Sequence, residues 1–374
     1  NGLFLENLDI NFLAYDNISR CNKAILDPPP HNKNYFNNQI EAISNYFKNI
    51  SNNSIDLNYD VIDSVYTASN YMREYSYSEN HLTALYLEAL ELASSEIEVY
   101  LINNNVNIDE VLIVVFHSGL GQDIKAGIFD PTIYDIHSAY IDNEMLNSLD
   151  NSNLSNVCMD SNCWAYDNDI TQGILLPETL NMIFYDVIED VLPVTFINDN
   201  ELENIYCDSQ YGITGLFAYL LGYAMGFPPM HDTNSGYTRI GKFGLMDQGS
   251  FNGRGVIPSI PNPWTRIKFL DYPFNNVTDS LFYHNQLTIS IPKRSMNDTI
   301  YRIDISENEY FLIENSNNKI EFNNEVLELD EFSSYLEDSL EDDFYWIDAL
   351  SFLEEDFFIS DGVLTNVQNY DYGM

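Results

Sequence analysis

The sequence is organised around residues 211–246, which read YGITGLFAYLLGYAMGFPPMHDTNSGYTRIGKFGLM. Almost every residue from 213 to 227 is apolar or small, which predicts a helix buried on all sides in a globular core. The run is shorter than the stretch of about 20 residues that a membrane-spanning helix requires. Pro228 and Pro229 follow, and we expect them to end the helix because proline lacks an amide donor and clashes with the preceding turn.

Two motifs in and just after this stretch carry a family resemblance. Residues 222–228 (GYAMGFP) and 231–233 (HDT) are similar to a helix that reads roughly HExGHxLGLPDxxDT. Residues 241–253 (GKFGLMDQGSFNG) follow a methionine turn of the form GxxGxWGLMDxGxxNG almost letter for letter. Both motifs belong to the M6 family of secreted zinc metallopeptidases, the immune-inhibitor-A-like group, which this chain resembles.

The resemblance covers most of the chain and is strongest between residues 205 and 270. It extends to residues 111–123 (VLIVVFHSGLGQD), 263–267 (PWTRI) and 310–315 (YFLIEN). It implies an α+β fold with a zincin- or metzincin-like core. Such a core has a twisted mixed sheet, a buried active-site-type helix and a methionine turn, here followed by antiparallel β segments.

The residues that carry out zinc chemistry in the family are replaced in this chain. Active zincins place two histidines at i and i+4 on one helix face, with a glutamate between them as general base. In register, these positions hold Tyr219, Leu220 and Tyr223, while the third-ligand position holds Pro229 and the methionine of the turn is Met246. Leucine cannot accept a proton from water, and neutral phenols with a pKa of about 10 are poor substitutes for imidazole. The sequence therefore predicts a pseudopeptidase with a vestigial site and no zinc.

A pseudopeptidase would act as a binding or structural module, with a protein or cell-surface partner or by self-assembly. Two alternatives remain open. The first is an active secreted metallopeptidase with atypical ligands, because zinc accepts both histidine and carboxylate ligands; the candidates are His117, His231, Asp232 and Asp247. For His117, a structural role in the turn that follows it is favoured over metal binding. The second alternative is a surface-layer or filament subunit.

The composition excludes several classes of partner. The chain carries 58 acidic against 15 basic residues, a net charge of -43, whereas nucleic-acid binding needs clustered Lys and Arg. The same charge disfavours anionic membrane surfaces, and no apolar stretch is long enough to span a membrane. Apolar residues make up 45% of the chain, which indicates a globular protein rather than a disordered one.

The four cysteines indicate an oxidising compartment. Cys158 and Cys163 lie close together in a polar loop (CMDSNC), a spacing suited to a local disulfide, and Cys21 with Cys207 would form the second. A four-cysteine zinc site is disfavoured because the chain has no CxxC unit. Disulfide bonds would place the protein outside the cell or on its surface.

An acidic loop at residues 160–169 (DSNCWAYDND) is a candidate calcium site. Its oxygen-bearing side chains stand at short intervals, and calcium takes six to eight oxygen ligands. The candidate ligands are Asp160, Asn162, Asp167 and Asp169. The spacing is not that of an EF-hand, and a solvated loop explains it equally well. The resemblance favours calcium because M6-like proteins commonly bind it.

We expect two domains, a peptidase-type domain at residues 1–272 and a β-rich extension at 273–374 that continues beyond the chain's last residue. Within the extension, residues 321–356 are rich in Asp, Glu and apolar residues, which favours an acidic helical insertion with one apolar face. Periodicity predicts the other elements. Helices are expected at 35–47, 82–102 and 180–191, and strands at 3–14, 54–65, 111–117, 286–292, 300–305 and 310–314.

Overall fold

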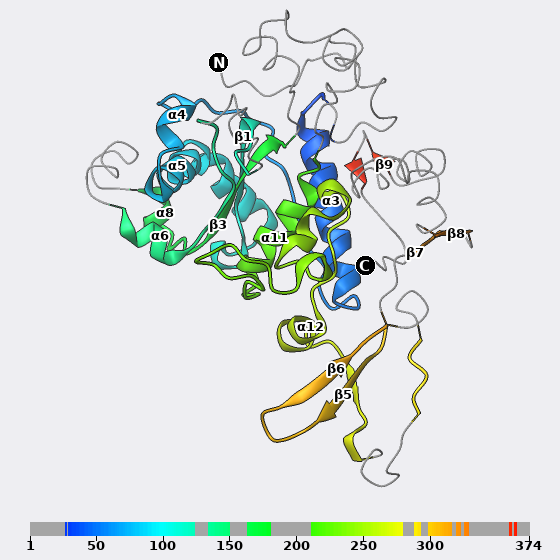
Figure 1. The fold of residues 1–374 in the computed structure, drawn as a ribbon. Helices are drawn as coiled ribbons and strands as arrows, with labels where there is room; N and C mark the ends of the chain where they lie inside the picture. Colours follow the sequence, from blue (N-terminus) through cyan, green and yellow to red (C-terminus); the bar gives the residue numbers. More distant parts are fainter. Residues whose placement is uncertain are drawn as a thin grey trace, which may run out of the picture. The chain divides into compact units, whose positions relative to one another are not determined.

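The computed structural model describes residues 27, 29–123, 134–149, 163–180, 211–279, 288–292 and 298–315, and the backbone of four short strands between 319 and 364. Over these residues the fold is mixed α+β, with several helices and small mixed sheets (Figure 1). The chain divides into two units, residues 1–37 with 60–213 and residues 38–59 with 214–374. These units do not correspond to the two domains expected from the sequence, so the domain boundary after residue 272 stays a prediction.

The first unit is built on helix α5 (Glu79–Asn104), which confirms the helix predicted at residues 82–102. Asn105 ends α5 in the left-handed conformation, with its amide donating to the Ile102 carbonyl and the Val106 amide donating to the Leu101 carbonyl. Four shorter helical segments surround α5 in the sequence: α4 (Met72–Tyr75), η1 (Ile108–Glu110), α6 (Asn143–Ser148) and α8 (Trp164–Asp167).

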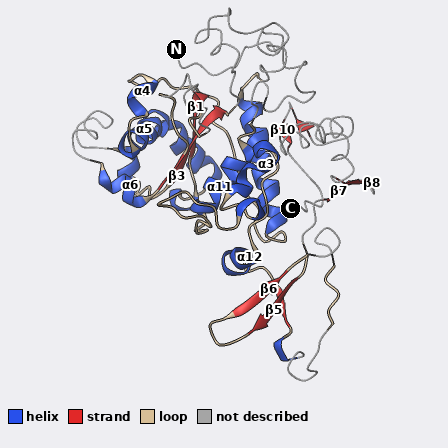
Figure 2. Cartoon of the chain, viewed as in Figure 1, coloured by secondary structure: helices blue, strands red, loops and turns tan. Residues whose placement is uncertain are grey.

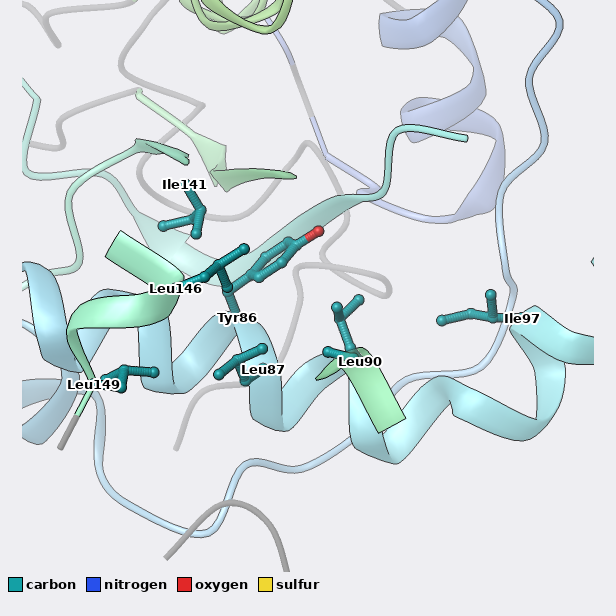
Figure 3. Close-up of a cluster of buried hydrophobic side chains, with 8 residues drawn as sticks. Tyr86, Leu87, Leu90, Ile97, Ile141, Leu146 and Leu149 are labelled. Atoms are coloured by element: carbon teal, nitrogen blue, oxygen red, sulfur yellow. The ribbon is translucent and has the colours of Figure 1, made fainter. Parts of the chain in front are cut away.

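A core forms where α5 meets α6 and the sheet. Tyr86, Leu87, Leu90 and Ile97 come from α5 and pack with Ile141 and with the two leucines of the α6 region (Figure 3). All of these side chains are buried, and burial of each large apolar group stabilises a fold by about 1.5–3 kcal/mol. The residues of this cluster that come from the helix predicted at 82–102 are therefore core residues.

The sheet of this unit has the order β1-β3-β2, with β1 (Val114–Leu120), β2 (Ala139–Ile141) and β3 (Gly173–Thr179). Strands β1 and β3 run parallel and lie side by side (Figure 2), and β2 pairs antiparallel to β3. The strand predicted at residues 111–117 is confirmed in type, but it starts at Val114. Within the described sheet the central, fully buried strand is β3, which the sequence analysis missed.

Helix α3 (Lys33–Ile50) confirms the amphipathic helix predicted at residues 35–47, and the division between the two units falls within it. The strand predicted at residues 54–65 is wrong, because this segment forms no strand. Its apolar side chains Tyr59, Ile62 and Val65 are exposed and lie next to no partner strand in the described sheets. Local alternation of polar and apolar residues does not by itself create a strand.

In the second unit, the helix predicted within residues 213–227 is confirmed as α11 (Thr214–Ala224). It is not buried on all sides as expected, because Tyr219, Tyr223 and Ala224 are only partly buried. Gly226 ends it, not the prolines: Gly226 is left-handed (φ +82°), its amide donates to the Tyr223 carbonyl, and the Phe227 amide donates to the Gly222 carbonyl. This is the Schellman arrangement, which satisfies the last helix carbonyls before the prolines begin. The helix is followed by η5 (Gly241–Phe243), η6 (Gln248–Gly255) and α12 (Pro263–Phe269).

The C-terminal strands belong to this unit. A three-stranded sheet has the order β4-β5-β6, from β4 (Phe274–Asn276), β5 (Ile300–Asp304) and β6 (Tyr310–Ile313). Strands β5 and β6 confirm the predictions at 300–305 and 310–314 and pair antiparallel as expected, whereas β4 and β5 pair in parallel. Residues 288–292 form no strand, so that part of the prediction at 286–292 is wrong.

Two antiparallel strand pairs follow, β7 (Lys319–Phe322) with β8 (Glu325–Glu328) and β9 (Ile359–Ser360) with β10 (Val363–Leu364). The helical insertion predicted at 321–356 is therefore wrong at its start, where β7 and β8 lie. Its remainder, the strand predicted at 3–14 and nearly all of the helix predicted at 180–191 fall outside the described residues. Among the helices that the structure does describe, none has the length and apolar character needed to cross a membrane.

Candidate functional site

Helix α11 places Tyr219 and Tyr223 one turn apart on the same face, as residues at i and i+4 must lie. Their hydroxyl oxygens are 2.9 Å apart and share a hydrogen bond. Their rings meet edge to face, with centroids 5.0 Å apart. Both side chains are partly buried. These two positions, which the sequence resemblance aligns with zinc-binding histidines, hold a hydrogen-bonded pair of phenols.

The methionine turn packs against this helix. Met246 is buried, and its sulfur would lie 2.7 Å from a Cβ atom added at Gly222. The Met246 carbonyl accepts a hydrogen bond from the Met230 amide (2.8 Å) and one from Nδ1 of His231 (3.3 Å). These contacts connect the helix exit, which includes the half-buried Pro229, to the turn.

Asp247 holds the turn together. Its Oδ2 atom accepts from the Thr238 hydroxyl and from three successive amides, at 2.8–3.0 Å, and its Oδ1 accepts from the Gln248 amide. The three amides belong to residues 239, 240 and 241. Burial would raise the pKa of this carboxyl, but these donors outweigh burial and hold its pKa below the ordinary value. Asp247 is therefore an ionised structural cap.

The phenols remain protonated at neutral pH. Burial raises the pKa of Tyr219 far above its ordinary value, and the hydrogen bond to Tyr223 and the charge of Asp247 raise it further. Burial also raises the pKa of Tyr223. Leu220, which the resemblance aligns with a general base, is buried and has no group that titrates. These residues do not fit a hydrolytic zinc site, which needs neutral imidazoles and a base beside them.

The atypical ligands considered from the sequence are engaged elsewhere. Asp232 accepts from the amides of Asn234 and Ser235 and forms an ion pair with Arg239 at 2.9 Å. Nδ1 of His117 donates to the Ser118 carbonyl, and burial lowers the pKa of His117 to about 4. Among the residues that the structure describes, no three His, Cys, Asp or Glu side chains gather so that they could hold a metal ion.

The calcium and disulfide predictions fall largely outside the described residues. Asp160 and Asn162 are not among these residues, Asp167 ends α8, and Asp169 has a left-handed backbone. Calcium binding at this loop stays a prediction. Cys163 forms a disulfide bond. The other three cysteines, at positions 21, 158 and 207, lie outside the described residues, so the pairing stays a prediction as well.

A buried polar cluster in the first unit was missed by the sequence analysis. Nδ1 of His31 lies 2.8 Å from Oε2 of Glu178, whose Oε1 accepts from the Gly119 amide at 2.7 Å. The Tyr35 hydroxyl donates to the Glu178 carbonyl. The contact joins residues far apart in sequence, and no local pattern signals it. It connects the start of α3 to strand β3 and has the character of a structural clamp.

Comparison with known proteins adds nothing to the family resemblance, which depends on the sequence motifs alone. A scan against protein-family models and searches of curated proteins and of solved structures each found no match.

Proposed function

We propose that this chain is a secreted or cell-surface homologue of the M6 metallopeptidases that has lost peptide hydrolysis and acts as a binding or structural module. The observation that carries the proposal is the hydrogen bond between the hydroxyls of Tyr219 and Tyr223, 2.9 Å apart on α11. Two groups that satisfy each other occupy the positions of the two zinc-binding histidines of the family.

The contacts of the methionine turn support the M6-like, zincin-like core in this proposal. Met246 packs against Gly222 of α11, as expected of a turn that supports an active-site-type helix. Hydrolysis by zinc enzymes requires a metal-activated water and a base that takes its proton. Leu220 supplies no base, and the raised pKa of each phenol keeps it protonated. The scaffold is retained while the groups for peptide cleavage are not.

An extracellular location is part of the same proposal. The disulfide at Cys163 supports it, since disulfide bonds persist in oxidising compartments. The net charge of -43 suits a medium rich in counterions, including the calcium that the loop at residues 160–169 would bind. The partner would be a protein or a cell-surface component, or a second copy of the chain.

A casein hydrolysis assay tests the loss of activity. The purified chain is assayed with added zinc, with and without a chelator, beside the variants Tyr219→Phe and Tyr237→Phe. Tyr237 is exposed and lies outside the site, so its variant is a matched control. We expect no hydrolysis above background in any sample. Hydrolysis that the chelator abolishes and that Tyr219→Phe alone lacks would contradict the proposal.

A further inference from the structure

The segment before α4 presents a backbone without partners. Residues 60–68 contain no helix, turn or bend, and residues 62–67 are all exposed. Within the residues that the structure describes, no group hydrogen-bonds to the backbone N–H or C=O of residues 62–68. We propose that residues 62–67, the open segment, bind an extended peptide segment of a partner protein in which basic and apolar side chains alternate. The inference rests on the proposed function only in taking the chain to bind a protein partner, and it names that partner's chemistry.

Two glutamates hold the open segment along helix α5. The Ser69 amide donates to Glu88 at 2.6 Å, and the hydroxyls of Ser64 and Tyr66 donate to Glu96 at 2.5 and 2.9 Å. Glu88 and Glu96 lie about two helix turns apart, which is about 12 Å. Five residues of extended chain reach about 16 Å, whereas five residues of helix reach only about 8 Å. The open segment therefore runs nearly extended along α5.

The side chains of the open segment alternate as those of a strand do. Ser64 and Tyr66 face α5 through the bonds to its glutamate, and Ala68 packs against the buried cluster that α4 and α5 share. Because successive side chains of an extended chain point to opposite sides, Asp63 and Val65 point away from the helix. The unpaired N–H and C=O groups lie between the two sides. Such a row of free backbone groups is a template on which a peptide adds as a further strand.

The helix surface beside the open segment is apolar. Leu92, Val99 and Ile102 of α5 are 40%, 56% and 77% exposed. Leu92 precedes Glu96 by four residues and Val99 follows it by three, so both lie on the helix face that the open segment crosses. A peptide strand added next to the open segment would place every second side chain over these residues. Apolar side chains at these alternate positions would cover them.

The charge of this surface selects a basic partner. Residues 60–68 and α5 carry two Asp and five Glu, with no Lys or Arg among them. One base, Lys33, approaches from α3 and lies 3.8 Å from Asp60. The outward side of an added strand would lie beside Asp63, where Lys or Arg is attracted. A second copy of the chain is a poor partner, because it brings 58 acidic residues against 15 basic ones.

Binding of a fluorescent peptide of four Lys-Val repeats to the full chain, followed by fluorescence anisotropy, tests the inference. In its extended form this peptide has all lysines on one side and all valines on the other. We expect saturable binding of one peptide per chain, weakened by salt. The same peptide with methylated backbone nitrogens keeps every charge and side chain but loses its amide donors. We expect it to bind at least about 10-fold more weakly.

Proline and charge variants locate the binding. Successive residues of an extended chain point their amides to opposite edges, so Ile62→Pro and Val65→Pro remove donors from different edges. One of the two should weaken binding by about 5-fold or more, and the other should not. Asp63→Asn should weaken binding by about 3-fold at low salt and less at high salt. Asp279→Asn, at an exposed acid in the other unit, is the matched control and should bind as the wild type does.

Circular dichroism establishes that each variant is folded, and the methylated peptide tests the wild-type chain without any substitution. The absence of saturable binding, equal binding of the methylated peptide, or equal losses in Asp63→Asn and Asp279→Asn would overturn the inference. So would unchanged binding in both proline variants. A wild-type dimer in sedimentation that one proline variant abolishes would place a second copy on the open segment, and this also overturns it.

The outcomes keep the two proposals apart. None of these binding results bears on the proposed loss of hydrolysis, because the peptide titration does not measure cleavage. Casein hydrolysis that depends on zinc would overturn the proposed function, whatever the peptide titration shows.

Discussion

The packing of α11 against the methionine turn predicts that Gly215→Ala is strongly destabilising. A Cβ atom at this position would lie 1.8 Å from the Ser250 carbonyl oxygen and 2.9 Å from the Gly255 carbonyl oxygen. Overpacking typically costs about 1–3 kcal/mol when side chains can adjust. Here the obstacles are backbone atoms of η6, so we take about 3 kcal/mol or more as the cost. Alanine regains about 1 kcal/mol of helix propensity, which leaves a net loss of about 2 kcal/mol or more.

Urea unfolding followed by circular dichroism measures this loss. Gly236→Ala is the matched control, because Gly236 has no atom within 4 Å of the added Cβ and only its positive φ of 71° opposes the change. The control should lose about 1 kcal/mol. If Gly215→Ala proves as stable as the wild type, or no less stable than the control, then α11 and η6 do not approach each other as described.

Three further changes test the groups that hold the fold together, each by urea unfolding. Asp247→Asn should cost about 2 kcal/mol, since an amide nitrogen cannot accept the amide bonds that this carboxylate receives; an unchanged stability would refute its role as cap. Arg266→Ala should cost roughly 3 kcal/mol, because its buried guanidinium pairs with Asp298 and Glu314, and Arg266→Lys should restore only part; full restoration by lysine would argue against the paired geometry. Finally, burial lowers the pKa of His117 from 6.5 to about 4. Between these pH values the imidazole is protonated in the unfolded chain and neutral in the folded chain. Stability should therefore fall by up to about 3 kcal/mol as the pH drops from 6.5 towards 4, and His117→Gln should lack this component; an identical pH profile in that variant would contradict the assignment.

Local patterns predicted the helices well. The helices at residues 213–227 and 82–102 were both predicted, because an unbroken apolar run and a helical spacing of apolar residues are each visible within a single segment. The end of α11 was misassigned to the prolines. The bonds that end it depend on the left-handed Gly226, a backbone state that the letters alone do not display.

Long-range contacts could not be predicted in this way. The segment at residues 54–65 alternates like a strand, but a strand needs a partner, and none of the described strands pairs with it. Arg266 reads as an ordinary helix residue, yet it pairs with carboxylates 32 and 48 residues further along the chain. The missed clamp of His31 and Glu178 joins residues 147 apart.

In the candidate site, the local geometry was predictable from the sequence and the long-range contacts were not. Spacing alone predicted that Tyr219 and Tyr223 share a helix face, and α11 bears this out. The hydrogen bond between them, the contact of His231 with the methionine turn and the set of amides on Asp247 depend on how separate segments meet. Their residue types are visible in the sequence, but their partners are not.

The most direct test of the central claim compares zinc binding by the wild type and by Tyr219→His/Tyr223→His. Chelator-treated, metal-free protein of each kind is titrated with zinc by calorimetry. We expect no stoichiometric zinc in the wild type and one zinc per chain in the double variant, where two imidazoles at i and i+4 face one ion. One tightly bound zinc in the wild type, accompanied by casein hydrolysis, would contradict it.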